Sequence, residues 1–390
     1  MIISDLPTPA VLVEKKRLEK NLSDMQEHAA REGVQLRPHT KTHKSVFIAN
    51  MQRDLGASGL TVAKLGEAET FVDAGFEDIR LAYALVGDDK YARVARLMAR
   101  ARISFCVDTF EGASAASTFF SDKGLEAEVV VETDIGYHRC GVLWNRPEGA
   151  VFAARVDEMP GLKVVGILTH AGHSYYGPQS ENESLADSLK RVSDQERDRM
   201  LEFAVSLREA GVRAAVSGDL EISIGSTPSL RYFTNKEHEG FRVTEIRPGN
   251  YVFHDMTQVN LGVQPIDRCA LTAYATVFSK HRNEDGSDRL FLDSGKKVLT
   301  SDGAFKAAGF GQILENADNM VPLPNSVVNA LSEEHGWVRI EGGTSLQVGD
   351  RVRVVPNHAC VVVNTQKQMV LVEGENVIQA IPVDAQSLVV

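Results

Sequence analysis

The stretch Leu36-Arg37-Pro38-His39-Thr40-Lys41-Thr42-His43-Lys44 follows a short apolar run at residues 34–36 and precedes a helical pattern that begins near Ser45. The apolar run predicts a strand, so three cationic side chains and two histidines crowd the exit of that strand. Packing does not require such a cluster, because like charges repel and buried charges need partners. Strand exits are, however, where α/β proteins assemble their chemistry. A basic, solvated turn is the alternative interpretation.

Beyond this stretch, short apolar runs alternate with amphipathic ones, which predicts strands followed by helices. Together with residues 34–38, the strand-like runs are 59–63, 79–83, 103–107, 128–132, 164–169, 221–224 and 244–247. The longest helical pattern covers about 183–210 and ends before Gly211. Eight such units predict a closed (β/α)8 TIM barrel rather than an open doubly wound sheet. The open sheet stays the alternative, although no Gly-x-Gly-x-x-Gly follows the first strand.

After about residue 251 the helical spacing mostly disappears and strands dominate. The predicted strands are 270–278, 289–292, 351–355, 360–364 and 369–372. We therefore expect two domains, a barrel over residues 1–250 and a mostly-β domain over residues 251–390. The short strand predicted at residues 11–13 lies in a segment, residues 1–14, that could pack with the β domain instead.

Composition excludes several classes of partner. The net charge is −11, which argues against nucleic acid or an anionic membrane as the main partner. No apolar stretch approaches the roughly 20 residues of a membrane span, and the N-terminus does not have the pattern of a secretion signal. The four cysteines form no Cys-x-x-Cys pair, which favours reduced thiols and a cytoplasmic location.

Polar residues gather at the predicted strand exits, which in a barrel share one mouth. They are His39 and Lys41, Thr61, Tyr83, Asp108, Asp134 with His138 and Arg139, His170, Ser226 with Thr227, and Arg247 with Gly249. The turn Gly225-Ser226-Thr227-Pro228 could aim backbone N–H groups at a phosphate, or it could simply be a helix N-cap. A lysine, several cations and such a turn around one mouth point to pyridoxal phosphate held as a Schiff base.

A second group of candidate residues is Pro356-Asn357-His358-Ala359-Cys360, which follows an alternating strand. If the chain stays extended, His358 and Cys360 point to the same side. An imidazole beside a thiolate forms half of a zinc site and leaves positions open for water or substrate. A buried cysteine and a satisfied core histidine are the alternative interpretation.

The stretch from Arg37 to Lys44 resembles the cofactor-lysine motif of the D-serine dehydratase and D-threonine aldolase family. These are fold-type III pyridoxal-phosphate enzymes, related in fold to bacterial alanine racemase. Further matches follow in order: ETDIGYHRCG at 132–141, THAGHSY at 169–175, GSTP at 225–228, RPGNY at 247–251 and PNHAC at 356–360. The resemblance implies a barrel that carries the cofactor, a β domain that carries a metal, and a homodimer.

Residue by residue, the resemblance implies that Lys41 forms the Schiff base and that Arg139 faces the pyridine nitrogen. It implies a phosphate site made of Gly225, Ser226, Thr227, Gly249 and Asn250, with His170 and Tyr175 near the ring or the phosphate. His358 and Cys360 would bind a divalent metal, zinc by likeness to the dehydratases, with manganese as the alternative.

The implied reaction is dehydration of a D-3-hydroxy amino acid, such as D-serine, D-threonine or D-threo-3-hydroxyaspartate, to a 2-oxo acid and ammonia. The aldolase branch tends to carry a carboxylate in place of the cysteine, so Cys360 favours dehydration. Retro-aldol cleavage to glycine and an aldehyde is the nearest alternative, followed by an amino-acid racemase and by a non-catalytic carrier of the cofactor. Residues 361–365 match no substrate-reading pattern, so the preferred substrate stays open.

Overall fold

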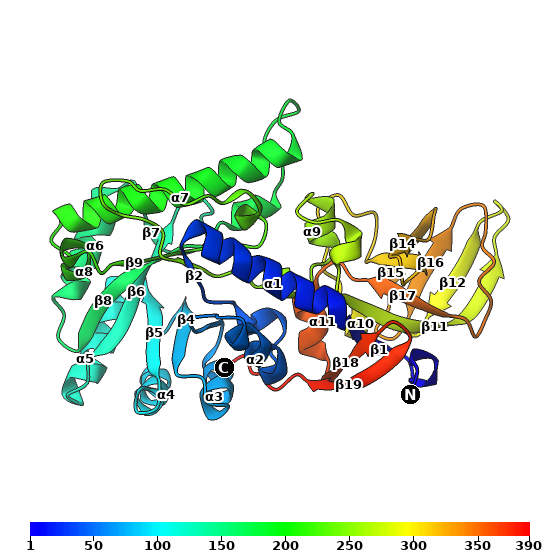
Figure 1. Ribbon diagram of the computed structural model, residues 1–390, viewed down its shortest axis with the longest axis horizontal. Coiled ribbons are helices and arrows are strands. Elements are labelled where there is room, and N and C mark those ends of the chain that lie inside the picture. The colour runs from blue at the N-terminus through cyan, green and yellow to red at the C-terminus, as the bar shows by residue number, and fades with distance from the viewer. The chain divides into compact units, whose positions relative to one another are not determined.

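The computed structural model describes residues 1–390, which divide into two compact units (Figure 1). The barrel unit consists of Met25–Lys41, Ala49–Gly249 and Leu388–Val390. The β unit consists of Met1–Asp24, Thr42–Ile48 and Asn250–Ser387. No helix is both long and apolar enough to cross a membrane, and all four cysteines are free thiols.

Eight parallel strands form the barrel, in the order β2-β10-β9-β8-β6-β5-β4-β3. Their bounds are β2 Gln35–Leu36, β3 Leu60–Val62, β4 Asp78–Ala84, β5 Arg102–Val107, β6 Ala127–Asp134, β8 Leu162–Leu168, β9 Glu221–Ile224 and β10 Glu245–Ile246. A parallel bridge between His39 and Thr61 joins the two ends of this sheet, and the Thr61 N–H donates to the Pro38 carbonyl at 2.9 Å. The sheet therefore closes, and the predicted (β/α)8 barrel is confirmed.

Helices follow the strands around the outside of the barrel (Figure 1). They are α3 Leu65–Asp73, α4 Asp88–Met98, α5 Phe110–Asp122, α6 Pro147–Asp157, α7 Leu185–Glu209 and α8 Arg213–Ser217. Helix α4 buries Tyr91, Val94 and Leu97, the three-residue spacing of one helix face. Helix α7 begins where the Ser184 hydroxyl accepts the Asp187 N–H at 3.0 Å, an N-cap that satisfies a free donor. The chain crosses between the units within α1 (Lys15–Glu32) and α2 (Val46–Asp54).

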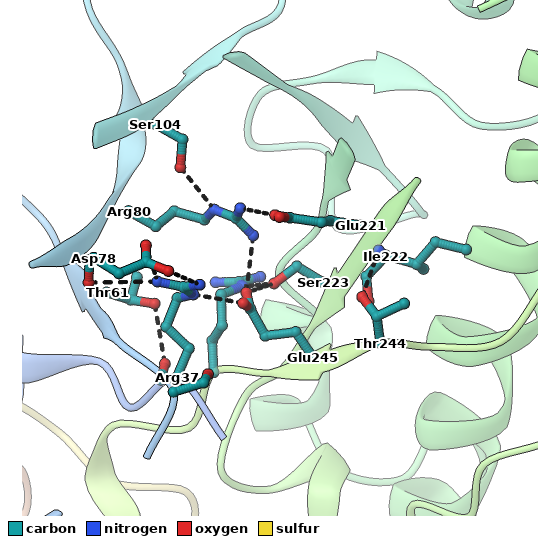
Figure 2. Close-up of polar contacts among 12 residues, drawn as sticks. Arg37, Thr61, Asp78, Arg80, Ser104, Glu221, Ile222, Ser223, Thr244 and Glu245 are labelled. Carbon is teal, nitrogen blue, oxygen red and sulfur yellow. Dashed lines mark hydrogen bonds and ion pairs between the residues drawn. The ribbon is translucent and has the colours of Figure 1, made fainter. Parts of the chain in front are cut away.

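The interior of the barrel holds a network of buried charges beneath the strand exits (Figure 2). Glu245 accepts from Arg37 Nε at 2.5 Å and from Arg80 Nη1 at 2.9 Å, and both arginines are almost fully buried. The Arg37 guanidinium also reaches Asp78 through two hydrogen bonds of 2.6 and 3.0 Å. It passes over Gly59, where a Cβ would lie 2.3 Å from Arg37 Nη1, so only glycine fits there. Strands at the barrel seam are thus joined by ion pairs as well as by backbone hydrogen bonds.

The β unit contains a ten-stranded sheet in which β1 (Ala10–Glu14) lies between β11 and β18. The pairing is antiparallel except between β1 and β18. The other strands are β11 Leu271–Arg282, β12 Asp288–Leu292, β13 Gln312–Asn316, β14 Val321–Pro322, β15 Ser326–Leu331, β16 Gly336–Ile340, β17 Arg351–Val355, β18 Gln368–Glu373 and β19 Asn376–Pro382. Short helices α9 (Met256–Asn260), α10 (Lys296–Leu299) and α11 (Ala359–Thr365) complete the unit.

The strand predicted at residues 360–364 is wrong, because this segment forms helix α11. His358 still has an extended backbone at the N-cap position, and the helix begins at Ala359. The Ala359 N–H donates to the Asp255 carboxylate at 2.9 Å, which satisfies one of the first free donors of the helix. The run Val361-Val362-Val363 suggested a strand because β-branched residues favour strands, but this distant carboxylate caps a helix there.

Replacing Glu245 with glutamine should destabilise the barrel, because two buried guanidinium groups lose the carboxylate that they share. Removing one partner of a buried ion pair costs about 3–5 kcal/mol, and we expect a loss of that size in the free energy of unfolding measured with urea. The control is Arg100→Ala, which removes a solvent-exposed pair with Asp73 and should cost less than about 1 kcal/mol. A loss in Glu245→Gln no larger than in the control would contradict the prediction.

The same glutamate should make the stability of the protein sensitive to acid. Burial alone raises the pKa of Glu245, but Arg80, Arg37 and the Ser223 hydroxyl lower it from 4.5 to about 2. The stability that ionised Glu245 provides is therefore present above its unfolded pKa and is lost as the pH falls from about 4.5 towards 2. Glu245→Gln should lack this share of the acid sensitivity, which unfolding curves measured at several pH values would reveal.

Candidate active site

A cavity of about 460 Å³ lies at the carboxyl end of the barrel strands. Its lining comes from the exits of six strands and from the loop after β6: His39, Lys41, Ala63, Lys64, Ala82, Tyr83, Ala84, Glu132, Arg139, Cys140, Leu168, His170 and Arg247. Of the predicted cofactor residues, the cavity brings together Lys41, Arg139 and His170. Four cationic side chains and one carboxylate line it, so it suits an anionic ligand.

Lys41 follows β2 in a 3-10 turn, Thr40–Thr42, and is half-buried. Its N–H donates to His39 Nδ1 at 3.4 Å, and the neighbouring Thr40 hydroxyl donates to the Thr61 carbonyl at 3.2 Å. The backbone that carries the lysine is therefore fixed to the adjacent strand β3. Lys44 differs, because it belongs to the β unit, where its Nζ donates to the Ala385 carbonyl at 3.4 Å.

Arg139 lies on the loop after β6, which folds back over the strand exits. The Asp134 carboxylate holds this loop by accepting the N–H groups of Gly136 at 2.8 Å and His138 at 3.0 Å. Arg139 Nη2 donates to Glu132 Oε1 at 3.4 Å, and the Cys140 thiol donates to the same oxygen at 2.8 Å. Glu132 is buried while Arg139 is exposed at the cavity mouth, so the carboxylate tethers the guanidinium from below.

His170 follows β8, and its Nδ1 lies 3.1 Å from the Gly225 carbonyl. A carbonyl can only accept, so Nδ1 carries the proton and Nε2 keeps a lone pair. Desolvation, with the charges of Lys41 and Arg139, lowers the pKa of His170 well below its ordinary value. The imidazole is therefore neutral and can accept a hydrogen bond in the cavity.

The predicted phosphate turn follows β9. Gly225 has a φ of +144°, and a Cβ there would lie 2.9 Å from the Arg247 amide nitrogen, so the position requires glycine. The N–H of Gly225 donates to Glu196, whereas the N–H groups of Ser226 and Gly249 have no acceptor in the chain. Both residues are buried, and a buried N–H without an acceptor is rare. These two donors, at the exits of adjacent strands β9 and β10, fit an anion such as a phosphate.

The other predicted phosphate residues are placed differently. Thr227 is buried in the turn, and Tyr175 is half-buried at the end of the 3-10 helix Gly172–Tyr175. Asn250 belongs to the β unit, where its Nδ2 donates to Asp255 Oδ2 at 2.5 Å. The same Asp255 caps helix α11, so Asn250 is linked to the segment that carries Cys360.

His358 and Cys360 lie beside one another in the β unit, both half-buried. Cys360 above all, together with Asp302, raises the pKa of His358 to about 11 against the opposing effect of burial. His358 Nδ1 lies 2.8 Å from Asp302 Oδ2, and the Thr42 hydroxyl lies 3.2 Å from Cys360 Sγ. A carboxylate on Nδ1 fixes the orientation of the imidazole ring, as it does for many metal-binding histidines.

No group of three or more His, Cys, Asp or Glu side chains comes together as a metal site. The donor set therefore stays at the imidazole and the thiolate that the sequence predicted. A closed structural zinc site has four protein ligands and a catalytic zinc usually has three, so water, substrate or another group would have to complete the coordination here.

The chain matches two family models, "Alanine racemase, N-terminal domain" over residues 13–256 and "Putative serine dehydratase domain" over residues 270–372. It is 33% identical to D-threo-3-hydroxyaspartate dehydratase of Delftia sp. over 91% of both chains. The solved structure of that dehydratase superimposes with a TM-score of 0.86 over 98% of both chains at 30% identity. D-threonine aldolase of Arthrobacter sp. is 30% identical over 95% of this chain and 90% of its own length.

The chain belongs to the D-serine dehydratase and D-threonine aldolase family, which has the alanine racemase fold. The family resemblance drawn from the sequence motifs is thereby confirmed.

Sequence reasoning missed three functional candidates, the carboxylates Glu132, Glu196 and Asp302. Glu132 opens the family motif ETDIGYHRCG, and its place at a strand exit before Arg139 was a usable signal. Glu196 lies on a long helix and Asp302 in a loop, each far along the chain from the group that it contacts. No local pattern identifies such partners, because only the fold brings them together.

Cys140 should be slow to alkylate although it is exposed. Partial burial of the sulfur and the hydrogen bond to Glu132 raise the pKa of Cys140 from 9.0 to about 11. The alkylation rate with iodoacetamide, followed by mass spectrometry, should thus rise with a midpoint near pH 11. Glu132→Gln should move that midpoint towards 9, whereas Glu148→Gln on the exposed surface of α6 should leave it unchanged. A midpoint near 9 in the wild type would contradict the tether between Glu132, Arg139 and Cys140.

Proposed function

We propose that this chain is a pyridoxal-phosphate- and metal-dependent lyase that dehydrates a D-3-hydroxy amino acid to a 2-oxo acid and ammonia. The observation that carries the proposal is Lys41 in a cationic cavity at the strand exits, together with two buried, unpartnered N–H groups at the exits of β9 and β10, those of Ser226 and Gly249. The name of the Delftia relative, a D-threo-3-hydroxyaspartate dehydratase, supports the class of substrate and the reaction.

The residues present fit pyridoxal phosphate. Ser226 and Gly249 would hold the phosphate through their N–H groups, and Lys41 would supply the amine that binds the aldehyde. When bound, this cofactor supplies an electron sink for the bonds at the substrate Cα. The Lys41 amine would also be the group placed to take the substrate α-proton as general base.

Arg139 would face the pyridine nitrogen as a hydrogen-bond donor. A guanidinium has five N–H donors and no acceptor, and it does not release its protons in proteins. Arg139 would therefore leave the ring nitrogen unprotonated, which makes the ring a weaker sink than usual. Glu132 would hold the guanidinium in this position through its 3.4 Å contact. A weaker sink calls for additional help with the departing hydroxyl group.

His358 and Cys360 would hold the metal that gives this help, because a Lewis acid stabilises a departing hydroxide. Asp302 would fix the imidazole so that Nε2 is the ligand atom. Structures of a histidine-to-alanine mutant and of a metal-free cysteine-to-alanine mutant of D-threo-3-hydroxyaspartate dehydratase support a metal in this family. We include zinc as the metal, a homodimer as the assembly and the cytoplasm as the location in this proposal.

The test is an assay of all products together. The purified protein, supplied with pyridoxal phosphate and zinc, should convert D-threo-3-hydroxyaspartate, D-serine or D-threonine to equal amounts of oxo acid and ammonia, with L-serine unchanged. Borohydride should fix the pyridoxyl group on Lys41, so Lys41→Ala should lose both label and activity while Lys44→Ala keeps the label. Glycine and an aldehyde would assign the aldolase reaction instead. Unchanged D-amino acids and an unlabelled Lys41 would overturn the proposal.

Removal of the metal should abolish dehydration without abolishing binding of the cofactor. Cys360→Ala should lose metal and dehydration but keep the visible absorbance of the bound cofactor, because Lys41 and the unpartnered N–H groups belong to the barrel unit. Asp302→Ala should weaken metal binding about 10–100-fold, measured by competition with a chelator, because His358 loses its orienting partner. Glu334→Gln, an exposed change in the same unit, is the control. Full dehydration by metal-free protein would end the assignment of His358 and Cys360.

A further inference from the structure

Glu196 is a buried carboxylate on helix α7 that contacts the exits of two barrel strands. Its Oε1 accepts the Gly225 N–H at 2.9 Å and the Ala171 N–H at 3.3 Å. Its Oε2 accepts the Ser229 hydroxyl at 2.6 Å. One side chain thus satisfies two backbone donors and one hydroxyl from the loops that follow β8 and β9.

These hydrogen bonds join the two loops that carry predicted cofactor residues. Ala171 directly follows His170, and Gly225 directly precedes Ser226. Two further contacts join the same loops. The His170 ring donates to the Gly225 carbonyl, and the hydroxyls of Ser174 and Ser226 lie 2.9 Å apart. Both backbone groups of Gly225 are therefore occupied. The next N–H along the chain, that of Ser226, is left without an acceptor.

Burying the carboxylate of Glu196 away from water costs free energy. No lysine, arginine or histidine pairs with its carboxylate, and Arg247 acts on it only from a distance. Burial raises the pKa of Glu196, as expected for a carboxylate removed from water. An apolar side chain would avoid that cost but would leave the N–H groups of Gly225 and Ala171 without acceptors. What Glu196 provides is thus a fixed geometry for the two loops.

We propose that Glu196 is a positioning residue for the phosphate of the cofactor. By accepting the Gly225 and Ala171 N–H groups, it fixes the turn that offers the Ser226 N–H, beside that of Gly249, to the anion. Gly225 itself contributes shape rather than a hydrogen bond, because its N–H already belongs to Glu196. This inference rests on the proposed function, since it assumes that pyridoxal phosphate binds in this cavity.

The experiment compares two ligands that differ only in the phosphate. Cofactor-free protein is titrated with pyridoxal phosphate and with pyridoxal, and Schiff-base absorbance gives the two dissociation constants. Glu196→Ala should weaken pyridoxal phosphate at least about tenfold and pyridoxal less than about twofold, because two N–H groups lose their acceptor. Glu196→Gln keeps an acceptor oxygen for those groups and should restore pyridoxal phosphate to within about threefold of the wild type.

Ser188→Ala is the matched control, because Ser188 is buried on the same helix and its hydroxyl donates only to the Leu185 carbonyl of that helix. If Glu196→Ala folds poorly, Glu196→Asp, which withdraws the carboxylate by one methylene, gives the same comparison. Equal weakening of both ligands, or a glutamine variant as weak as the alanine variant, would overturn the inference. A wild-type chain that bound pyridoxal as tightly as pyridoxal phosphate would also overturn it while leaving Lys41 assigned. Absence of a Schiff base with either ligand would instead overturn the proposed function, and this inference with it.

Discussion

The rest of the barrel depends on the shared hydrogen bonds of Glu245 with Arg37 and Arg80. Barrels of this kind usually fill their interior with branched apolar side chains, and here charged groups occupy that space. Such groups are tolerated only when nearly every donor and acceptor is used. The remaining hydrogen bonds and ion pairs of the two arginines and Glu245 are made by Asp78, Ser104, Glu221 and Ser223 (Figure 2). Because Arg37 lies four residues before Lys41, the network that closes the barrel also fixes the strand exit from which the proposed cofactor lysine emerges.

The same network continues towards the cavity. Ser223 donates to Glu245 at 2.5 Å and accepts from Arg247 Nε at 2.7 Å, and Arg247 in turn donates to the Thr169 carbonyl. Arg247 lines the cavity and Thr169 precedes His170, so the cavity floor is the upper edge of the ion network. In such a series of hydrogen bonds each side chain has one orientation that satisfies its neighbours, so the position of one side chain fixes the position of the next. The Arg247 guanidinium is therefore placed by an acid deeper in the barrel, acting through Ser223.

Periodicity in the sequence predicted where the strands lie. It did not identify residues whose role depends on a side chain far away in the sequence. Alternating apolar runs predicted all eight barrel strands, and the exits of those strands predicted Lys41, Arg139 and His170 as cavity residues. Nothing in that pattern shows that Glu245 pairs with Arg80 across 165 residues, or that Asp302 reaches His358 across 56. Local propensity also failed where a distant group decided the outcome. Three consecutive valines indicated a strand at 360–364, but Asp255 caps a helix there.

The carboxylates around the cavity, Glu132, Glu196 and Glu245, share a chemistry that follows from the charge of the cavity. Four cations around one space repel each other unless acids lie near, yet acids that faced the ligand would repel an anionic cofactor and the carboxylate of an amino acid. The structure limits this conflict, because only one carboxylate lines the cavity and the other acids lie behind the cations. Glu132 lies below Arg139, Glu245 acts on Arg247 through Ser223, and Glu196 contacts only neutral donors. Glu196 and Glu245 do not line the cavity, so motif reasoning built on ligand contacts passes over them. Searching for buried acids one contact removed from a cationic cavity is the more productive way to read such a site.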